Sequence, residues 1–251
     1  MKPEEILVQL GKRNKLYALV SGGKDSITAA IQTDRIQKLT GVLFIDTTIG
    51  LAETKAFVEQ TCQERGWSLT ILRPKTSYED MVLKYGFPGP SHHRMAFIYL
   101  KWQPIYYWIK ERDDKDQIAL ISGVRRKESN RRGRTTEAIK IDPTYKHMVW
   151  VAPIIDMSDA EVWNFVRTEN IEVSPSYKTL HISGDCLCGA YSRRGEAELI
   201  TQFYPDIAKQ IQDLEKRCSV KYCTWGRQSS MKGAKDQQLL EGWLCADCGI
   251  R

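Results

Sequence analysis

The sequence contains no long uninterrupted run of hydrophobic residues. Its longest apolar region, residues 95–109, is broken by Lys101, Gln103 and Pro104, whereas a transmembrane helix needs about 18 or more apolar residues in succession. The first five residues, MKPEE, also lack the apolar core of a secretory signal peptide. We therefore expect a cytoplasmic protein that does not associate with membranes.

The composition has none of the extremes that mark unusual classes of protein. Of 251 residues, 42% are hydrophobic and 27% are charged, which is typical of globular domains and argues against disordered, collagen-like and coiled-coil chains. A chain of this length buries most of its unfolded surface without disulfide bonds. The sequence therefore predicts one large domain or two modest ones.

Cysteine is scarce in most of the chain and then becomes frequent. Of the seven cysteines, only Cys62 precedes residue 186. The other six are Cys186, Cys188, Cys218, Cys223, Cys245 and Cys248. In a cytosolic protein such clustering indicates metal binding or redox chemistry more often than disulfide bonds.

Strand and helix patterns alternate over the first 180 residues. Short apolar runs predict buried strands at residues 15–20, 41–45, 68–72 and 117–122. Helices are predicted at residues 25–36, 52–65 and 94–111, the last kinked at Pro104, and after a capping box formed by Ser158 and Glu161. This alternation predicts an α/β fold with a doubly wound, mostly parallel sheet and helices on both faces.

The segment Ser21-Gly22-Gly23-Lys24-Asp25-Ser26 follows the first predicted strand and opens a helix. Two glycines allow a tight turn and a close approach to a ligand, and the free N–H groups of the first helical turn face an anion. Lys24 adds a positive charge at a helix start that we expect to face solvent. The segment therefore predicts a phosphate-binding loop, although it lacks the spacing of the usual P-loop.

Polar residues also follow two other predicted strands. Asp46 and Thr47 end the second strand, at the edge where open sheets bind ligands. The Asp46 carboxylate could accept a hydrogen bond from a ribose hydroxyl, hold Mg²⁺ beside phosphates or cap the next helix. After Gly123, the forked side chains of Arg125 and Arg132 could grip phosphates, and Glu128 could anchor one of them.

Residues 125–134 form a strongly basic segment. They include six basic residues and one acidic residue, a net charge of +5. Such a segment favours a polyanion, DNA or RNA for example, or is simply solvated, and the sequence leaves both interpretations open.

These motifs together resemble the phosphoadenosine phosphosulfate (PAPS) reductase family of the adenine nucleotide alpha-hydrolase superfamily. The phosphate loop resembles that superfamily's pyrophosphatase loop (PP-loop). Four further matches follow in order: Asp46-Thr47-Thr48-Ile49-Gly50 with Glu53-Thr54, Gly86-Phe87-Pro88 with Leu100-Lys101, Gly123-Val124-Arg125-Arg126-Lys127-Glu128-Ser129 with Arg132, and Pro153-Ile154-Ile155-Asp156 with Val162-Trp163. The resemblance spans about residues 15–190 and departs from the family at Met157, where tryptophan is usual.

The resemblance implies a Rossmann-like PP-loop domain, placed here at residues 1–180, that binds ATP with Mg²⁺. The expected nucleotide contacts are Ser21, Gly22, Gly23, Lys24, Asp25, Ser26, Asp46, Thr47, Gly123, Arg125, Glu128 and Arg132. Among these, Lys24 and Asp25 are expected to take part in catalysis.

The remaining region, residues 181–251, is predicted to be a small, cysteine-rich helical unit packed on the sheet. The pairs Cys186–Cys188 and Cys245–Cys248 look like two metal knuckles. Their four thiolates suit a [4Fe-4S] cluster or, as the alternative, Zn²⁺. Cys218 and Cys223 could replace one pair or provide a resolving thiol.

The last five residues, DCGIR, also resemble the Glu-Cys-Gly-Leu-His end of PAPS reductases, in which the cysteine is the nucleophile. Cys248 is therefore a candidate metal ligand and a candidate nucleophile.

Two functions follow from this sequence. In the first, an ATP pyrophosphatase adenylylates an acceptor, with nucleic acid expected, for sulfur insertion from a cysteine desulfurase or another donor. The complete loop with Lys24 and the basic segment favour it. In the second, a reductase of adenylyl sulfate or its 3′-phosphorylated form uses Cys248 as nucleophile. A nucleotide-binding module without catalysis would use the same residues, and a turnover assay separates it from both.

Overall fold

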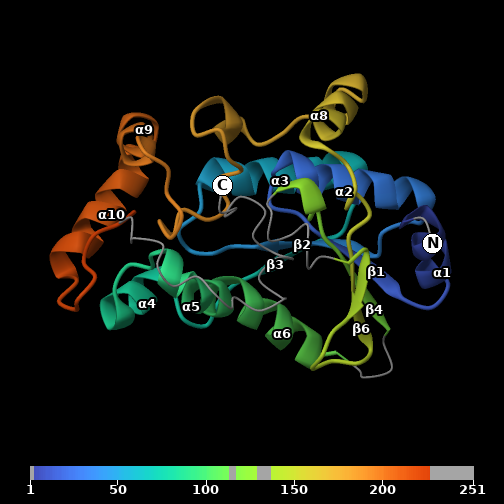
Figure 1. Cartoon of the computed structure of the whole chain (residues 1–251), viewed down its shortest axis with the longest axis horizontal. Helices are drawn as coiled ribbons and strands as arrows, with labels where there is room; N and C mark the ends of the chain where they lie inside the picture. The colour runs from blue at the N-terminus through green and yellow to red at the C-terminus, as the bar shows by residue number, and fades with distance from the viewer. Residues whose placement is uncertain (1–2, 113–116, 129–136, 227–251) are drawn as a thin grey trace.

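A six-stranded sheet forms the centre of the computed structural model, which describes residues 3–112, 117–128 and 137–226, without the side chains of residues 3, 4 and 128 (Figure 1). The strands are β1 (Lys15–Leu19), β2 (Gly41–Ile45), β3 (Leu69–Leu72), β4 (Ile118–Ile121), β5 (Ile139–Ile141) and β6 (Met148–Val151). Their order is β3-β2-β1-β4-β6-β5, and all neighbours are parallel except β5 and β6. The predicted mostly parallel α/β fold is confirmed.

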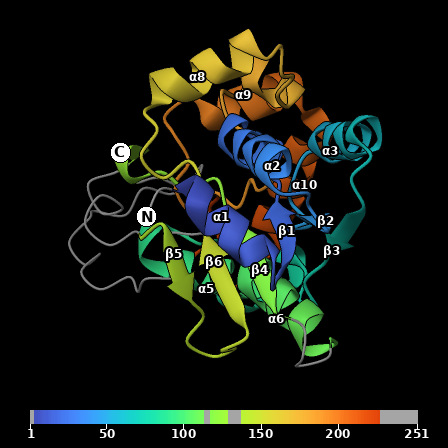
Figure 2. The same ribbon diagram turned by 90° about the vertical axis from the view of Figure 1, so that its right-hand side faces the viewer.

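Helices cover both faces of this sheet (Figures 1 and 2). On one side lie α1 (Pro3–Gly11), α2 (Lys24–Ile36), α3 (Ala52–Arg65) and α8 (Asp159–Thr168); on the other lie α4 (Tyr78–Tyr85), α5 (His93–Phe97), a π-helical turn η2 (Ile98–Trp102) and α6 (Gln103–Lys110). Three short turns are η1 (Pro90–His92), η3 (Arg126–Glu128) and η4 (Pro175–Lys178). Beyond the carboxyl ends of the strands lie α9 (Glu196–Phe203) and α10 (Pro205–Arg217).

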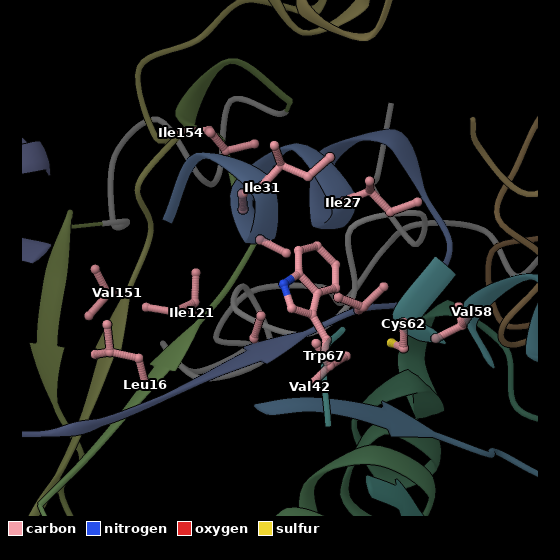
Figure 3. Packing of buried hydrophobic residues seen from close by; sticks show 14 of the residues in the cluster. Leu16, Ile27, Ile31, Val42, Val58, Cys62, Trp67, Ile121, Val151 and Ile154 are labelled. Atoms are coloured by element: carbon pink, nitrogen blue, oxygen red, sulfur yellow. The ribbon is translucent and has the colours of Figure 1, made fainter. Parts of the chain in front are cut away.

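Alternating side chains of the strands fill two separate cores. Figure 3 shows one of them, in which Leu16, Val42 and Ile121 of the sheet pack beneath Ile27 and Ile31 of α2. Neighbouring strand residues point to the opposite face, because successive side chains of a strand alternate. There they pack against the aromatic side chains of η2 and α6.

The segment predicted as one kinked helix, residues 94–111, is divided by the π-helical turn η2. Pro104 occupies the first turn of α6, where its missing N–H leaves no helical hydrogen bond unmade. The structure also contains two helices, α1 and α4, and two strands, β5 and β6, that the sequence analysis did not predict.

Residues on both sides of position 180 share a third hydrophobic cluster. Tyr78, Phe87 and Leu100 pack there with Leu187 and with residues of α9 and α10. The backbone N–H of Leu51 donates to the carbonyl of Gly184 at 2.8 Å, which ties the two parts at the edge of the sheet. In the described part of the chain, no helix is long and apolar enough to cross a membrane.

Because this cluster is shared, we expect the described parts of the chain to unfold as one unit. Leu214 of α10 is 1% exposed, so Leu214→Ala should lower the free energy of unfolding by about 2–5 kcal/mol. Phe203→Ala, at an exposed position on α9, should change it much less. Chemical denaturation followed by tryptophan fluorescence and by circular dichroism tests this, and two transitions that respond separately to Leu214→Ala would contradict it.

Candidate active site

The order in which strands are added to the sheet reverses between the neighbouring strands β1 and β4. The loops that follow these two strands lie against each other. From β1 the order runs outward through β2 and β3, and from β4 through β6. A crevice at such a switch point, beyond the carboxyl ends of the strands, is the general ligand site of open α/β sheets. The predicted phosphate loop follows β1, and Gly123 follows β4.

The phosphate loop is tightly folded and mostly buried. Gly22 has a φ of 81°, a conformation that favours glycine. The Ser26 hydroxyl donates to the carbonyl of Gly23 at 2.9 Å and accepts from the backbone N–H of Ser21 at 3.1 Å. Gly123 lies against this loop so closely that a Cβ there would come within 2.6 Å of the backbone of Asp25 and Ser26.

Lys24 does not face solvent as the sequence led us to expect. It is 9% exposed, because α8 packs on α2 above the loop. The Lys24 ammonium lies 2.9 Å from Asp25 Oδ2 and 3.0 Å from Asp159 Oδ1. It also lies 5.7 Å from the ring centroid of Trp163, within the range of a cation–π contact.

Arg125 completes a cluster of four charged side chains, Lys24, Asp25, Arg125 and Asp159, which we call the charged cluster. Its Nε lies 2.7 Å from Asp25 Oδ1, and its Nη2 lies 3.0 Å from Asp159 Oδ1. Burial acts to raise the pKa of Asp159, but the hydrogen bond and charge of Lys24 and the charge of Arg125 hold this pKa below its usual value. Two cations and two carboxylates balance each other, which offsets the cost of burying Lys24, Asp25 and Arg125.

A pocket lies beside the loop, at the carboxyl ends of the strands. Its apolar wall consists of strand ends, Leu19, Val20, Leu43 and Ile45, and its polar lining consists of Ser21, Ser26, Lys101, Ser122, Gly123 and Asp185. The apolar wall suits a flat base, and the polar side, next to the loop, suits ribose and phosphate groups.

Lys101 and Asp185 are two pocket residues to which the sequence analysis assigned no role. Lys101 Nζ lies 2.8 Å from Asp185 Oδ2, and both side chains are buried. Ser183 donates its hydroxyl hydrogen to Asp185 Oδ1 at 2.7 Å, and Thr47 donates to the Asp185 carbonyl at 2.8 Å. These contacts fix Asp185 at the pocket. Its place directly before Cys186 was the one sequence feature that could have marked it as a functional residue.

Asp46 lies at the carboxyl end of β2, as expected, but it does not cap the next helix. The N-cap of α3 is Leu51. The Asp46 carboxylate lies 3.1 Å from Arg73 Nε and 3.9 Å from Lys55 Nζ, and it accepts from the backbone N–H of Thr48. A ribose hydroxyl or Mg²⁺ would have to compete with these two cations.

The loop of Cys186 and Cys188 is held by its backbone. Tyr78 donates its hydroxyl hydrogen to the carbonyl of Cys188, and Trp225 Nε1 donates to the carbonyl of Leu187, each at 2.9 Å. The Cys188 side chain is buried, whereas that of Cys186 is partly exposed. This loop thus holds two cysteines on a fixed backbone shortly after Asp185, which lines the pocket.

Cys218 and Cys223 lie next to each other after α10. The Cys223 thiol donates to the carbonyl of Cys218 at 3.0 Å. The hydrogen bond with the Cys218 side chain, followed by burial, raises the pKa of the Cys223 thiol. Whether these two cysteines replace one metal knuckle or provide a resolving thiol stays a prediction.

The structure brings together the phosphate loop, Gly123 and Arg125, with Asp46 and Thr47 on the neighbouring strand end. Cys245, Cys248, Arg132 and most of the basic segment lie outside the described residues, as does the side chain of Glu128. Across the described ranges, no group of three or more His, Cys, Asp or Glu side chains is arranged to hold a metal ion. The four-cysteine ligand set therefore stays a prediction.

The model of the phosphoadenosine phosphosulfate reductase domain matches residues 15–190 of this chain. An uncharacterized protein of Methanocaldococcus jannaschii is 26% identical over 209 residues, which cover 82% of this chain and 49% of that protein. The adenosine 5′-phosphosulfate reductase of Shouchella clausii is 26% identical over 183 residues, 66% of each chain. The matched part of this chain thus spans about half the length of the first relative and 66% of the length of the second.

Two solved structures share the fold at TM-scores of 0.52. One is the PAPS reductase of Candida auris in a phosphate complex, with 17% identity over 71% of this chain and 84% of that chain. The other is the FMN adenylyltransferase of Candida glabrata with FAD and inorganic pyrophosphate, with 14% identity over 71% of this chain and 59% of that chain. At this identity the likeness shows the fold alone.

The buried ion pair of Lys101 and Asp185 yields a stability prediction. Lys101→Met leaves the Asp185 carboxylate buried without its ionic partner, which should lower the free energy of unfolding by about 3–5 kcal/mol. The double variant Lys101→Met/Asp185→Leu should recover most of this loss, because both charges are gone. Lys38→Met, at an exposed ion pair, is the control, and equal effects of Lys38→Met and Lys101→Met in urea denaturation would refute the prediction.

Proposed function

Since the chain belongs to the phosphoadenosine phosphosulfate reductase domain family of enzymes, we propose that it reduces adenylyl sulfate or the 3′-phosphorylated form of that nucleotide. The observation that carries the proposal is the extent of the family match. Residues 15–190 include the phosphate loop, every residue that lines the pocket and the loop of Cys186 and Cys188. The curated relatives named as reductases support the same chemistry.

The pocket offers complementary surroundings for such a nucleotide. The base would lie against the strand ends Leu19, Leu43 and Ile45, and the phosphosulfate would lie at the phosphate loop. Backbone N–H groups at the start of α2 favour an anion there. Lys24 and Arg125, from two different loops, supply the positive charge.

In this reaction the Cys248 thiolate attacks the sulfur atom of the nucleotide. A sulfur–sulfur bond forms, the sulfur–oxygen bond breaks, and the nucleotide phosphate leaves with the electron pair. Lys24 and Arg125 would stabilise the charge on that leaving phosphate. A dithiol reductant such as thioredoxin then attacks the Cys248 sulfur, releases sulfite and is itself oxidised to a disulfide.

The second candidate is ATP pyrophosphatase chemistry for sulfur insertion, and the intact loop with Lys24 favours it. An acceptor oxygen attacks the α-phosphate of ATP, pyrophosphate leaves, and a persulfide sulfur then displaces AMP. Mg²⁺ and Lys24 would stabilise the leaving pyrophosphate. DNA or RNA would contact residues 125–134, and a cysteine desulfurase or another donor would supply the sulfur.

The cysteine loop fits a metal site as half of a ligand set. Cys186 and Cys188 present two soft sulfur donors on a backbone that Tyr78 and Trp225 hold in place. For the second candidate reaction, we propose that Cys245 and Cys248 provide the other half for a [4Fe-4S] cluster, with Zn²⁺ as the alternative. A cluster would supply redox or sulfur-binding chemistry at this edge of the sheet. Cys248 belongs to this set only if it is not the nucleophile.

Two turnover assays separate the candidate reactions. Protein purified without oxygen should release sulfite from adenylyl sulfate or PAPS in the presence of thioredoxin, and Cys248→Ser should abolish this release. Cys62→Ser is the matched control, because burial raises the pKa of the Cys62 thiol to about 11 and keeps it inert. Pyrophosphate release from ATP with Mg²⁺, without sulfite from either nucleotide, would reject the reductase in favour of the second candidate.

Metal content tests the ligand set independently of turnover. Cys186→Ser and Cys188→Ser should each lower bound iron or zinc to less than half of the wild-type content, because a structural site rarely survives the loss of a thiolate. Cys62→Ser should keep full content. If Cys248→Ser also keeps it, Cys248 is not a ligand. Full metal content in Cys186→Ser and Cys188→Ser would exclude the proposed site.

A further inference from the structure

Asp159 makes an unusual contact in the charged cluster. A single carboxylate oxygen, Asp159 Oδ1, lies 3.0 Å from both Lys24 Nζ and Arg125 Nη2. The two cations come from different loops, one after β1 and one after β4. They converge on one oxygen atom, as the donors of a phosphate site converge on a phosphate oxygen.

The two carboxylates of the cluster are not equivalent. The Asp25 side chain is 6% exposed and lies between Lys24 and Arg125, whereas the Asp159 side chain is 63% exposed. Asp159 is the first residue of α8, so its side chain can turn into water at little desolvation cost. The Asp25 side chain is buried and cannot turn into water in the same way.

Withdrawal of Asp159 would leave the cluster with an unbalanced positive charge. Two cations then face the single charge of Asp25, a net charge of +1 beside the phosphate loop. An entering phosphate oxygen would restore the balance at the same two nitrogen atoms. The carboxylate and the phosphate therefore compete for one position.

We propose that Asp159 is a built-in competitor of the nucleotide phosphate, which holds Lys24 and Arg125 in position and lowers the affinity for phosphorylated ligands. This inference rests on the proposed function only in that the phosphate loop binds a nucleotide phosphate, whichever reaction follows. A competing conformation lowers the apparent affinity by the fraction of molecules that are competent to bind. The competition also favours ligands with more than one negative charge over singly charged anions.

Calorimetric titration with inorganic pyrophosphate tests the inference without depending on turnover. Asp159→Asn should bind pyrophosphate about three- to tenfold more tightly than the wild type, as expected for the removal of two partly exposed ion pairs. Asp159→Glu, which keeps the charge, should stay within about twofold of the wild type.

Asp156→Asn is the matched control. Asp156 lies just before α8, is exposed and pairs with Arg126 rather than with the charged cluster. The Asp156→Asn variant therefore loses one negative charge, as Asp159→Asn does, from the same surface. The affinity of this variant for pyrophosphate should stay within about twofold of the wild type. Adenosine, which has no phosphate, should bind equally to the wild type and Asp159→Asn.

Each other result overturns a specific statement. Equal affinity of the wild type and Asp159→Asn for pyrophosphate would show that Asp159 does not compete with the ligand. Weaker binding by Asp159→Asn would show that Asp159 helps to bind the ligand, for example through Mg²⁺. Equal gains in Asp159→Asn and Asp156→Asn would reduce the effect to net charge. If pyrophosphate binds to neither the wild type nor Asp159→Asn, no phosphate competes with Asp159 and the inference fails. If adenylyl sulfate and PAPS also bind to neither protein, the phosphate loop is not a nucleotide site and the proposed function fails with it.

Discussion

The ion pair between Asp25 and Arg125 joins the two loops from which the candidate site is built. Asp25 begins the helix after β1, and Arg125 follows β4, so their contact at 2.7 Å closes the crevice at the switch point of the sheet. Only a residue without a side chain fits between these loops, which is why Gly123 stands where a Cβ would lie 2.6 Å from the loop backbone. Both charges are buried, so each offsets part of the cost of burying the other.

The rest of the fold supports this contact from two sides. Alternating strand residues anchor α2 on one face of the sheet and α6 on the other. Parallel neighbours then bring the ends of β1, β2 and β4 to the same edge. The charged cluster, Asp46 and the apolar wall of the pocket all lie at that edge, although their residues are far apart in the sequence.

Sequence patterns predicted the features that depend on a few neighbouring residues. The phosphate loop and the capping box of Ser158 and Glu161 both have local signatures. The burial of Lys24 has none, because it depends on the packing of α8 on α2. The same holds for the pairs Lys24–Asp159 and Lys101–Asp185. Strand β5 is short, and Ile141 in it is exposed, so the apolar pattern that predicts buried strands is missing.

The segment from Ser183 to Cys188 joins the nucleotide pocket to the cysteine-rich region. Asp185 contacts Lys101 in the pocket, and the next residue is Cys186. A glycine stands at position 50, where a Cβ would lie 2.5 Å from the carbonyl oxygen of Asp185, so this segment passes close to the end of β2. Cys186 therefore follows directly after a residue that lines the pocket. The proposed sulfonucleotide reduction and the alternative ATP-dependent sulfur insertion both need a nucleotide pocket at this edge of the sheet, so the fold alone is compatible with either reaction. The chemistry at Cys248 distinguishes them.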